Sequence, residues 1–159
     1  MESVFNRLLI AIKNKIFTDL PDSPEEPGIR YINQDLGQLD FYVQRPPVSW
    51  PCVLIDFTDT TYEQKQFKAQ WGQMNITLRM GFDQWSDSSN LAPQEVEEKA
   101  LRYFELENKL YKALQDWDAD GLLMVKMRRI GALSEQREDK YRVRRLSFRA
   151  MYEDRAAQG

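Results

Sequence analysis

Apolar residues near the start of the chain recur with the period of an α-helix. They are spaced by four positions and comprise Val4, Leu8, Ile12 and Ile16. This spacing gathers them on one face of a helix about four turns long. The segment 19–28 that follows contains three prolines and several acids, so it can continue neither a helix nor a strand. We therefore expect an amphipathic N-terminal helix followed by a surface loop.

The middle of the chain carries the signals of strands. Two short candidates, Ile29 to Asn33 and Leu39 to Gln44, precede a compact apolar strand candidate from Cys52 to Phe57. Its apolar residues are continuous from Cys52 to Ile55, which predicts a strand that is covered on both faces or lies centrally in the sheet. We interpret the polar stretch from Thr58 to Gln66 as an extended connection.

The clearest strand is expected from Phe67 to Phe82. In its second half, Asn75, Thr77 and Arg79 alternate with apolar residues, which predicts one buried face and one solvent-exposed face. The apolar parity changes at Gly72, and a β-bulge at this glycine is the simplest explanation.

A second helix is predicted to begin at Pro93, with acidic residues in its first turns as the helix dipole favours. Its expected buried side consists of Val96, Ala100, Tyr103, Leu110, Leu114 and Trp117. Asp118 to Gly121 should end it.

The chain then closes with two predicted strands. Leu122 to Ile130 and Tyr141 to Tyr152 are joined by a short polar connection, so we expect an antiparallel hairpin. A change of apolar parity near Arg144 predicts a second bulge.

These elements predict one α+β domain over residues 1–159. We expect an antiparallel sheet of about four to six strands with two helices packed on it. Residues 19–28 should form a surface linker loop, and residues 154–159 a frayed tail.

Composition removes many kinds of active site. The 159 residues include no His and one Cys, which excludes a Ser-His-Asp triad, a Cys-His pair, an imidazole metal site and an internal disulfide. Cys52 lies in an apolar run, so we expect a small buried hydrophobic residue rather than a reactive thiol. No apolar run approaches the ~20 residues needed to span a bilayer, so we expect no membrane association.

The acidic residues and glycines do not form a recognised catalytic pattern. Asp56 and Asp59 flank the end of a predicted strand and Glu63 follows them. A solvated turn explains these acids better than a cation site or an acid/base pair. Asp116, Asp118 and Asp120 resemble part of a calcium loop, but the position that needs a Glu is Met127. The chain also lacks a Gly-rich phosphate loop. We therefore expect no catalytic, metal or cofactor site.

The charge distribution is more informative than the net charge of −3. Residues 83–120 hold 4 basic and 10 acidic residues, a net of −6, whereas residues 121–159 hold 10 and 5, a net of +5. The basic side chains of the last hairpin are Lys126, Arg128, Arg129, Arg137, Lys140, Arg142, Arg144, Arg145 and Arg149.

Three interpretations of this split remain open. The acidic helix and the basic hairpin could balance each other within one chain. The hairpin could bind nucleic acid, although the net negative charge of the chain is unfavourable for a dedicated binder. An acidic patch on one copy could also meet a basic patch on the next, and head-to-tail contacts of this kind close into rings. The candidate subunit or partner contacts are Arg128, Arg129, Arg142, Arg144, Arg145, Glu95, Glu98, Glu105 and, as an exposed aromatic anchor, Trp85.

Four segments carry a resemblance to a known group of proteins. These are Pro51-Cys52-Val53-Leu54-Ile55-Asp56-Phe57, the alternating stretch from Gly72 to Ser86, the helical pattern from Ala100 to Leu114, and the terminal pattern from Val143 to Ala150. In this order, after an N-terminal helix and a Pro-rich loop, they resemble small phage tail-terminator and neck-completion proteins. The chain differs from that group in its longer loop at residues 19–28 and its longer Thr58–Gln66 connection.

The resemblance implies a structural protein of the virion, assembled in the host cytoplasm, and not an enzyme. It implies a homo-oligomeric ring, possibly a hexamer, that caps the tail tube and contacts the tail-tube protein and the head or neck connector. No cofactor is implied, and nucleic acid would be near only because it passes through the assembly. The alternative function is a nucleic-acid-binding module that uses the basic C-terminal hairpin.

Overall fold

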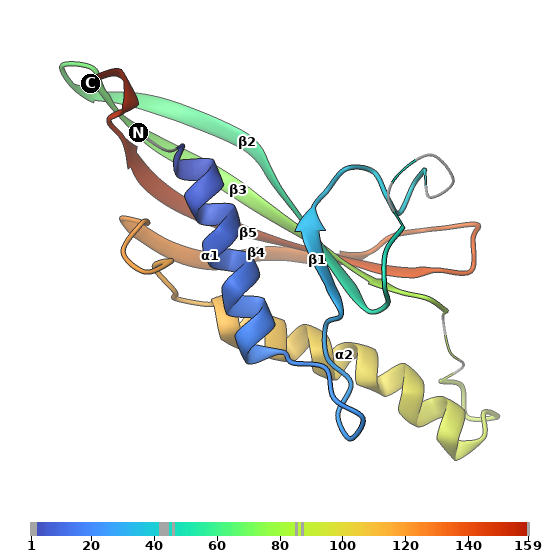
Figure 1. Ribbon diagram of the computed structural model, residues 1–159. Helices are drawn as coiled ribbons and strands as arrows, with labels where there is room; N and C mark the ends of the chain where they lie inside the picture. Colours follow the sequence, from blue (N-terminus) through green and yellow to red (C-terminus); the bar gives the residue numbers. More distant parts are fainter. Residues whose placement is uncertain (1–2, 42–44, 46, 85, 87, 159) are drawn as a thin grey trace.

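The computed structural model describes residues 3–41, 45, 47–84, 86 and 88–158. These residues form two α-helices and one five-stranded sheet, so the expected α+β class is confirmed (Figure 1). The helices are α1 (Val4–Asp19) and α2 (Gln94–Leu114). The strands are β1 (Tyr31–Gln34), β2 (Cys52–Gln66), β3 (Ala69–Phe82), β4 (Val125–Ser134) and β5 (Arg142–Asp154), in the spatial order β1-β2-β3-β5-β4.

The sheet is mixed rather than wholly antiparallel. β2, β3, β5 and β4 pair antiparallel with their neighbours, but β1 pairs parallel with β2, with Tyr31 opposite Cys52. Parallel neighbours need a long crossover instead of a tight turn. Residues 35–51 provide that crossover here.

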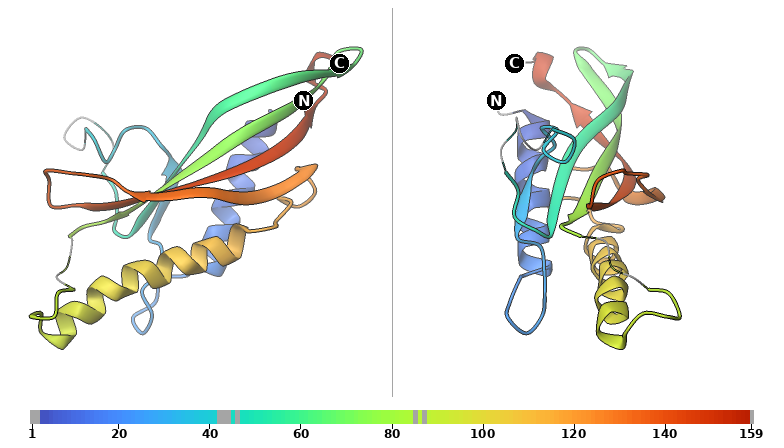
Figure 2. Two further views of the ribbon diagram at one scale, coloured as in Figure 1. Left: turned by 180° about the vertical axis from the view of Figure 1, so that it is seen from behind. Right: turned by 90° about the vertical axis from the view of Figure 1, so that its right-hand side faces the viewer.

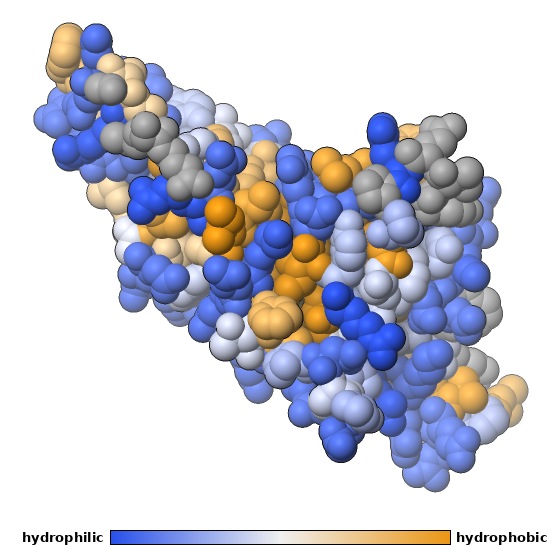
Figure 3. Space-filling model, in the orientation of Figure 1, coloured by the Kyte–Doolittle hydropathy of each residue, from blue (hydrophilic) through white to orange (hydrophobic). Residues whose placement is uncertain are grey.

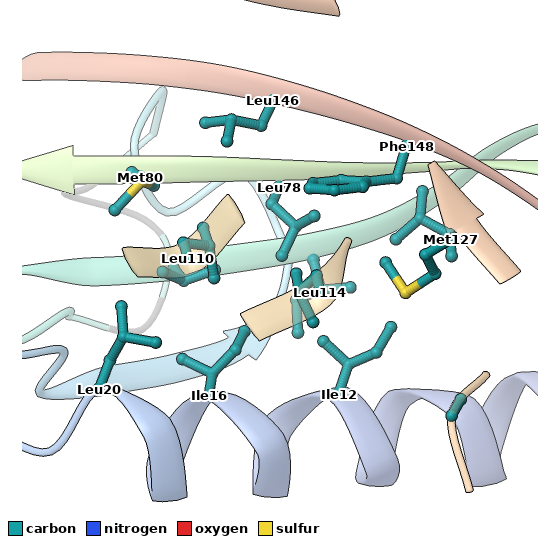
Figure 4. Packing of buried hydrophobic residues seen from close by; sticks show 14 of the residues in the cluster. Ile12, Ile16, Leu20, Leu78, Met80, Leu110, Leu114, Met127, Leu146 and Phe148 are labelled. Atoms are coloured by element: carbon teal, nitrogen blue, oxygen red, sulfur yellow. The ribbon is translucent and has the colours of Figure 1, made fainter. Parts of the chain in front are cut away.

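Both helices pack on one face of the sheet and form the main core with it (Figure 2). Figure 4 shows Ile12, Ile16 and Leu20 pointing from the α1 side toward Leu110 and Leu114 of α2 and toward the sheet. The apolar stripe predicted for α1 is confirmed, because Leu8, Ile12 and Ile16 are fully buried. On α2 the expected Ala100, Tyr103, Leu110 and Leu114 are buried, but Val96 in the first turn remains 37% exposed. Figure 3 shows that the face carrying α1 is mainly hydrophilic, with apolar patches along its middle.

The predicted bulge at Gly72 is wrong. β3 pairs with β5 in unbroken register from Gln70 to Phe82, and Gly72 itself lies opposite Tyr152. A Cβ atom built on Gly72 would lie 2.5 Å from Cε1 of Tyr152, so the glycine leaves room for this buried ring. The irregularity lies instead on β2, between Thr58 and Thr61.

The second predicted bulge, near Arg144, is also wrong. β5 keeps its register with β3 throughout, and the register shifts of the hairpin lie on β4. The apolar parity of β5 changes because Val143 belongs to a second, smaller cluster with Leu39, Cys52 and Leu54. The apolar positions that follow, from Leu146 onward, belong to the core beneath the helices.

Two expected segments also differ in the structure. Residues 39–41 form a turn and not a strand, since the chain reverses after Gly37 at φ 81°; residues 42–44 of the same prediction lie outside the described residues. The stretch 58–66, expected as a connection, is the second half of β2. It is polar and largely exposed, so the hydrophobic pattern gave no sign of the strand.

Residues 19–28 form a closely folded loop after α1. The backbone N–H of Gly28 donates to Asp22 Oδ1 at 3.0 Å, and Ile29 N–H donates to the carbonyl oxygen of Leu20 at 3.0 Å. A Cβ atom on Gly28 would lie 2.2 Å from the carbonyl oxygen of Pro21. A backbone atom cannot rotate aside as a side chain can, so this position requires glycine.

We therefore expect Gly28→Ala to lower the free energy of unfolding by about 1–3 kcal/mol, the usual cost of overpacking. Gly131→Ala is the matched control, because a Cβ there meets nothing within 4 Å. Urea unfolding of the two variants measures the difference. Equal stability of both variants would contradict the close approach at Gly28.

The two long hairpins extend toward opposite ends of the molecule. The β2–β3 turn lies at the end that also holds both chain termini, and the β4–β5 turn lies at the other end (Figures 1 and 2). Near the C-terminus, Ala156–Gln158 form a short 3-10 helix, and the Gln158 side chain donates to the carbonyl oxygen of Phe67 at 2.8 Å.

Candidate functional site

The sheet face opposite the helices carries the residues of the candidate site. On this outer face Leu39 of the crossover packs with Cys52, Leu54 and Val143 to form the second apolar cluster. The rings of Trp50 and Tyr141 stack beside it at 4.7 Å. Cys52 is fully buried, so the expectation of a small buried hydrophobic residue is confirmed. Burial raises the pKa of its thiol to about 12, which disfavours the reactive thiolate.

Next to this cluster lies a buried arginine. Arg79 is 5% exposed, and its guanidinium donates to three carboxylates. Nε and Nη2 reach the two oxygens of Glu135, both at 2.8 Å. Nη1 and Nη2 reach the two oxygens of Asp40 at 2.9 and 3.0 Å, and Nη1 also approaches Asp35 at 3.4 Å. Two bidentate contacts of this kind fix the guanidinium plane.

A second arginine extends the network. Arg137 Nη1 lies 3.0 Å from Glu135, and Nη2 lies 2.7 Å from Asp139. Nη2 also donates to the backbone carbonyl of Leu39. We call Arg79, Arg137, Asp40, Glu135 and Asp139 the Arg79 network. It ties the crossover 35–51 to the β4–β5 hairpin across the outer face of the sheet.

Mutual contacts fix the charge states of the network. Hydrogen bonds from Arg79 lower the pKa of Asp40. For Glu135, burial raises the pKa, but the contacts with Arg79, Arg145 and Arg137 together outweigh this effect and lower the pKa. Burial also works against the charged form of Arg79, yet Glu135 and Asp40 raise its pKa further still. All members are therefore ionised at neutral pH.

The lowered pKa values predict a loss of stability in acid. A carboxylate with a depressed pKa in the folded state stabilises the fold above its unfolded pKa, and this stabilisation is lost as the pH falls through the folded value. We expect the free energy of unfolding to decrease below about pH 4. In Glu135→Gln the decrease between about pH 6 and about pH 3 should be smaller, as chemical denaturation at both pH values would show. The control Glu25→Gln, which changes an exposed residue of the 19–28 loop, should show the same decrease in the free energy of unfolding as the wild type. An equal decrease in both variants would count against a stabilising role of the Arg79 network.

Beside the network the outer face is hollowed into a groove of about 540 Å³. Its lining is mixed in charge, and it includes Asp35, Asp40, Asp56, Asp59, Arg79 and Arg145. Among the described residues, no group of acids and cysteine is arranged to hold a metal ion. Asp56, Asp59 and Glu63 are exposed on β2, and Asp116 and Asp120 adopt positive φ in the turn after α2. The lining of the groove thus offers ionic contacts.

Three of the candidate arginines are engaged within the chain. Arg144 Nη2 donates to Glu107 of α2 at 3.0 Å. Arg142 and Arg144 both lie against the Phe104 ring, at 5.3 and 5.8 Å from its centroid. Arg145 pairs with Glu135 at 3.1 Å. The hairpin and α2 therefore balance part of their charge internally, through Glu107.

Arg128 and Arg129 differ from those three. Arg129 lies over the Tyr111 ring at 3.8 Å from its centroid, and its backbone N–H donates to Gln115. Arg128 is exposed and lies directly opposite Arg149 of β5, which is exposed as well. Within the described part of the chain neither residue of this Arg128–Arg149 pair has an ion partner.

The candidate acids of α2 lie away from the basic hairpin. Glu95 and Glu98 line a hollow with Asp22, Arg30 and Trp50, and Glu105 lies beside the 19–28 loop. All three are exposed, and none has an ion pair with another described residue. The structure therefore does not bring these acids together with Arg128 or Arg129. Trp85 lies outside the described residues.

Sequence reasoning missed the Arg79 network. Arg79 follows Asn75 and Thr77 in an alternating strand, so the pattern placed it on a solvent-exposed face. Its partners Asp40 and Glu135 lie 39 and 56 positions away along the chain. No local signal marks such distant pairing.

Comparison with known protein families and with curated protein sequences finds no match for this chain. Neither helix of the described part is long and apolar enough to cross a membrane.

Proposed function

We propose that this chain is a structural phage assembly protein. It forms a homo-oligomeric ring at the end of the tail tube and joins the tube to the head or neck of the virion. The proposal rests on the resemblance of its sequence motifs to tail-terminator and neck-completion proteins, and on the same order of elements in the α+β fold. In this role the protein acts through shape and contact and not through catalysis.

The observation that carries the proposal is the distribution of unpaired charge. Arg144 and Arg145 pair with acids of the chain and Arg142 lies over the Phe104 ring, whereas Arg128 on β4 has no acidic partner among the described residues. Glu95, Glu98 and Glu105 on α2 likewise have no basic partner there. Basic and acidic side chains that have no ion partner within the described residues, and that lie on separate parts of the surface, favour contacts between different chains. Such contacts set register and partner choice more than raw affinity.

Measurement of the oligomeric state tests this function. We expect native mass spectrometry of the full chain to show one closed oligomer, either alone or after addition of the tail-tube protein from the same genome. Electron microscopy of purified tubes should then show the oligomer at one tube end. A protein that stays monomeric at high concentration and does not bind tubes would contradict the proposal.

The alternative, a nucleic-acid-binding module, has one observation in its favour. The Arg128–Arg149 pair is exposed and could contact phosphates. Arg144 and Arg145 already pair with acids of the chain and are not free for a phosphate backbone. The net charge of −3 is also unfavourable for a dedicated nucleic-acid binder, so the ring is the better-supported proposal. Titration of labelled DNA at two salt concentrations tests the alternative, since phosphate contacts weaken steeply with salt.

A further inference from the structure

The sheet leaves part of β2 without a neighbour. β1 pairs with β2 only from Cys52 to Ile55, but β2 continues to Gln66. Among the described residues, no strand pairs with the outer side of β2 beyond Ile55. We call residues 56–66 the free part of β2. Natural proteins usually cover or block a long exposed strand edge, because its backbone groups can pair with another chain.

The opposite border of the sheet is also partly open. Near its start β4 is covered by the turn after α2, because Met127 exchanges backbone hydrogen bonds with Asp116 and Trp117. Beyond Gly131 this cover ends. Glu135 N–H donates to the carbonyl oxygen of Val143 on the β5 side, so by the alternation of an antiparallel ladder Ala132 and Ser134 direct their backbone groups outward. Ile130 and Leu133 beside this edge are 47% and 49% exposed.

The two borders carry opposite charge. Arg128 and Arg149 face each other across β4 and β5 without an acid, and like charges in directly opposite positions destabilise a sheet. On the free part of β2, Asp56, Asp59 and Glu63 are exposed and have no ion pair with a described residue. Lys65, the base among them, is already paired with Glu153 at 2.7 Å.

From these borders we propose that copies of this chain join edge to edge. The exposed end of β4 in one copy pairs with the free part of β2 in the next. This brings the basic β4–β5 side that carries the Arg128–Arg149 pair toward the acidic segment of β2 that carries Asp56, Asp59 and Glu63. This inference rests on the proposed ring, for which it supplies the lateral contact. The acids of α2 then remain available for a different partner.

Strand directions are compatible with such a joint. β2 and β5 both run antiparallel to β3, and β4 runs antiparallel to β5, so β4 runs opposite to β2. Copies arranged side by side in the same orientation therefore keep the antiparallel alternation. The free part of β2 and the exposed end of β4 lie at different positions along the strand direction. Asp56 pairs with Thr77, Thr77 with Ser147, and Ser147 with Gly131, so the two open parts extend in opposite directions from this row of residues. Pairing these two parts requires that each copy is shifted along the strand direction relative to its neighbour. Closed barrels have a comparable shift in register between their tilted strands. The contact is heterologous and can close into a ring.

Charge reversal with complementation tests the proposal. One variant carries Arg128→Glu and Arg149→Glu, and the other carries Asp56→Lys and Glu63→Lys. We expect each variant alone to associate more weakly than wild type by more than about tenfold, because like charges then meet at every joint. An equal mixture should recover association, since each reversed edge meets a complementary edge of the other variant. Arg7→Glu and Glu25→Lys, which change exposed residues away from both edges, are the matched controls, and circular dichroism verifies folding.

Cross-linking identifies the contact independently of its strength. Ala132→Cys and Thr61→Cys are introduced in separate chains, mixed and treated with a short bis-maleimide, while the buried Cys52 stays unreactive. We expect heterodimer formation well above that of a mixture in which Ser23→Cys replaces Thr61→Cys. One outcome would overturn the edge joint but leave the proposed ring standing. In it, the wild type forms rings, the charge-reversal variants assemble normally, and no cross-link is preferred. Charge-dependent edge cross-links in a protein that does not bind tail tubes would support the joint and count against the proposed function. A monomer without preferred cross-links would overturn both.

Discussion

Replacing Arg79 with methionine is expected to destabilise the fold by about 3 kcal/mol or more. The substitution keeps an unbranched side chain at a buried position but removes the cation between Asp40 and Glu135. Removal of one partner from a buried ion pair is costly because the remaining charge is desolvated and has lost that counter-ion. Asp40 and Glu135 would then keep only Arg137 and Arg145 as basic partners. The lost free energy should appear as a lower midpoint in urea with an unchanged slope.

Arg149→Met is the matched control for this result. Arg149 lies on the neighbouring strand and on the same face as Arg79, but it is exposed and makes one long contact of 3.4 Å with Asn75. We expect its replacement to change stability by less than about 0.5 kcal/mol. If the two methionine variants were equally stable, the Arg79 network would not be holding the crossover against the hairpin.

Replacement of Phe148 by alanine should have a comparable effect through a different mechanism. Phe148 is fully buried at the middle of β5, beneath both helices (Figure 4). Removing its ring costs the transfer free energy of the lost carbons and leaves a cavity, about 3–5 kcal/mol together. Calorimetry of the variant should show a melting temperature far below that of wild type.

A second phenylalanine in the chain provides the comparison. Phe67 lies in the β2–β3 turn and is 79% exposed. Phe67→Ala should leave the melting temperature nearly unchanged. A large loss in Phe67→Ala would show that the end of this hairpin is stabilised by contacts of the exposed ring.

The parts of the fold that could be predicted from the sequence are those with a regular apolar period. The stripe of α1 and the buried apolar set from Met74 to Phe82 lie where they were predicted. The prediction of a solvent-exposed opposite face on β3 was wrong, because Asn75 and Thr77 are half-buried and Arg79 is buried. The two bulge predictions failed for a common reason. A change of apolar parity was attributed to an extra residue, although Gly72 accommodates a ring and Val143 belongs to a second cluster on the opposite face.

The free part of β2 could not be predicted because it lacks a buried side. Its polar residues form a strand since β3 offers a hairpin partner, and this depends on tertiary structure and not on local pattern. The pairing of the charged side chains was even harder to predict from the sequence. The sequence indicated an acidic helix and a basic hairpin, but it could not show that Glu107 is the acid that pairs with Arg144, or that Arg79 is buried.

The position of β5 has a consequence for synthesis of the chain. This strand comes last in the sequence, yet it lies between β3 and β4 inside the sheet. While the ribosome is still making it, β3 has one open side, and Met74, Ile76 and Leu78 cannot be fully enclosed. The nascent chain therefore exposes apolar strand surface until β5 has emerged, and such transiently exposed surface favours aggregation during that interval.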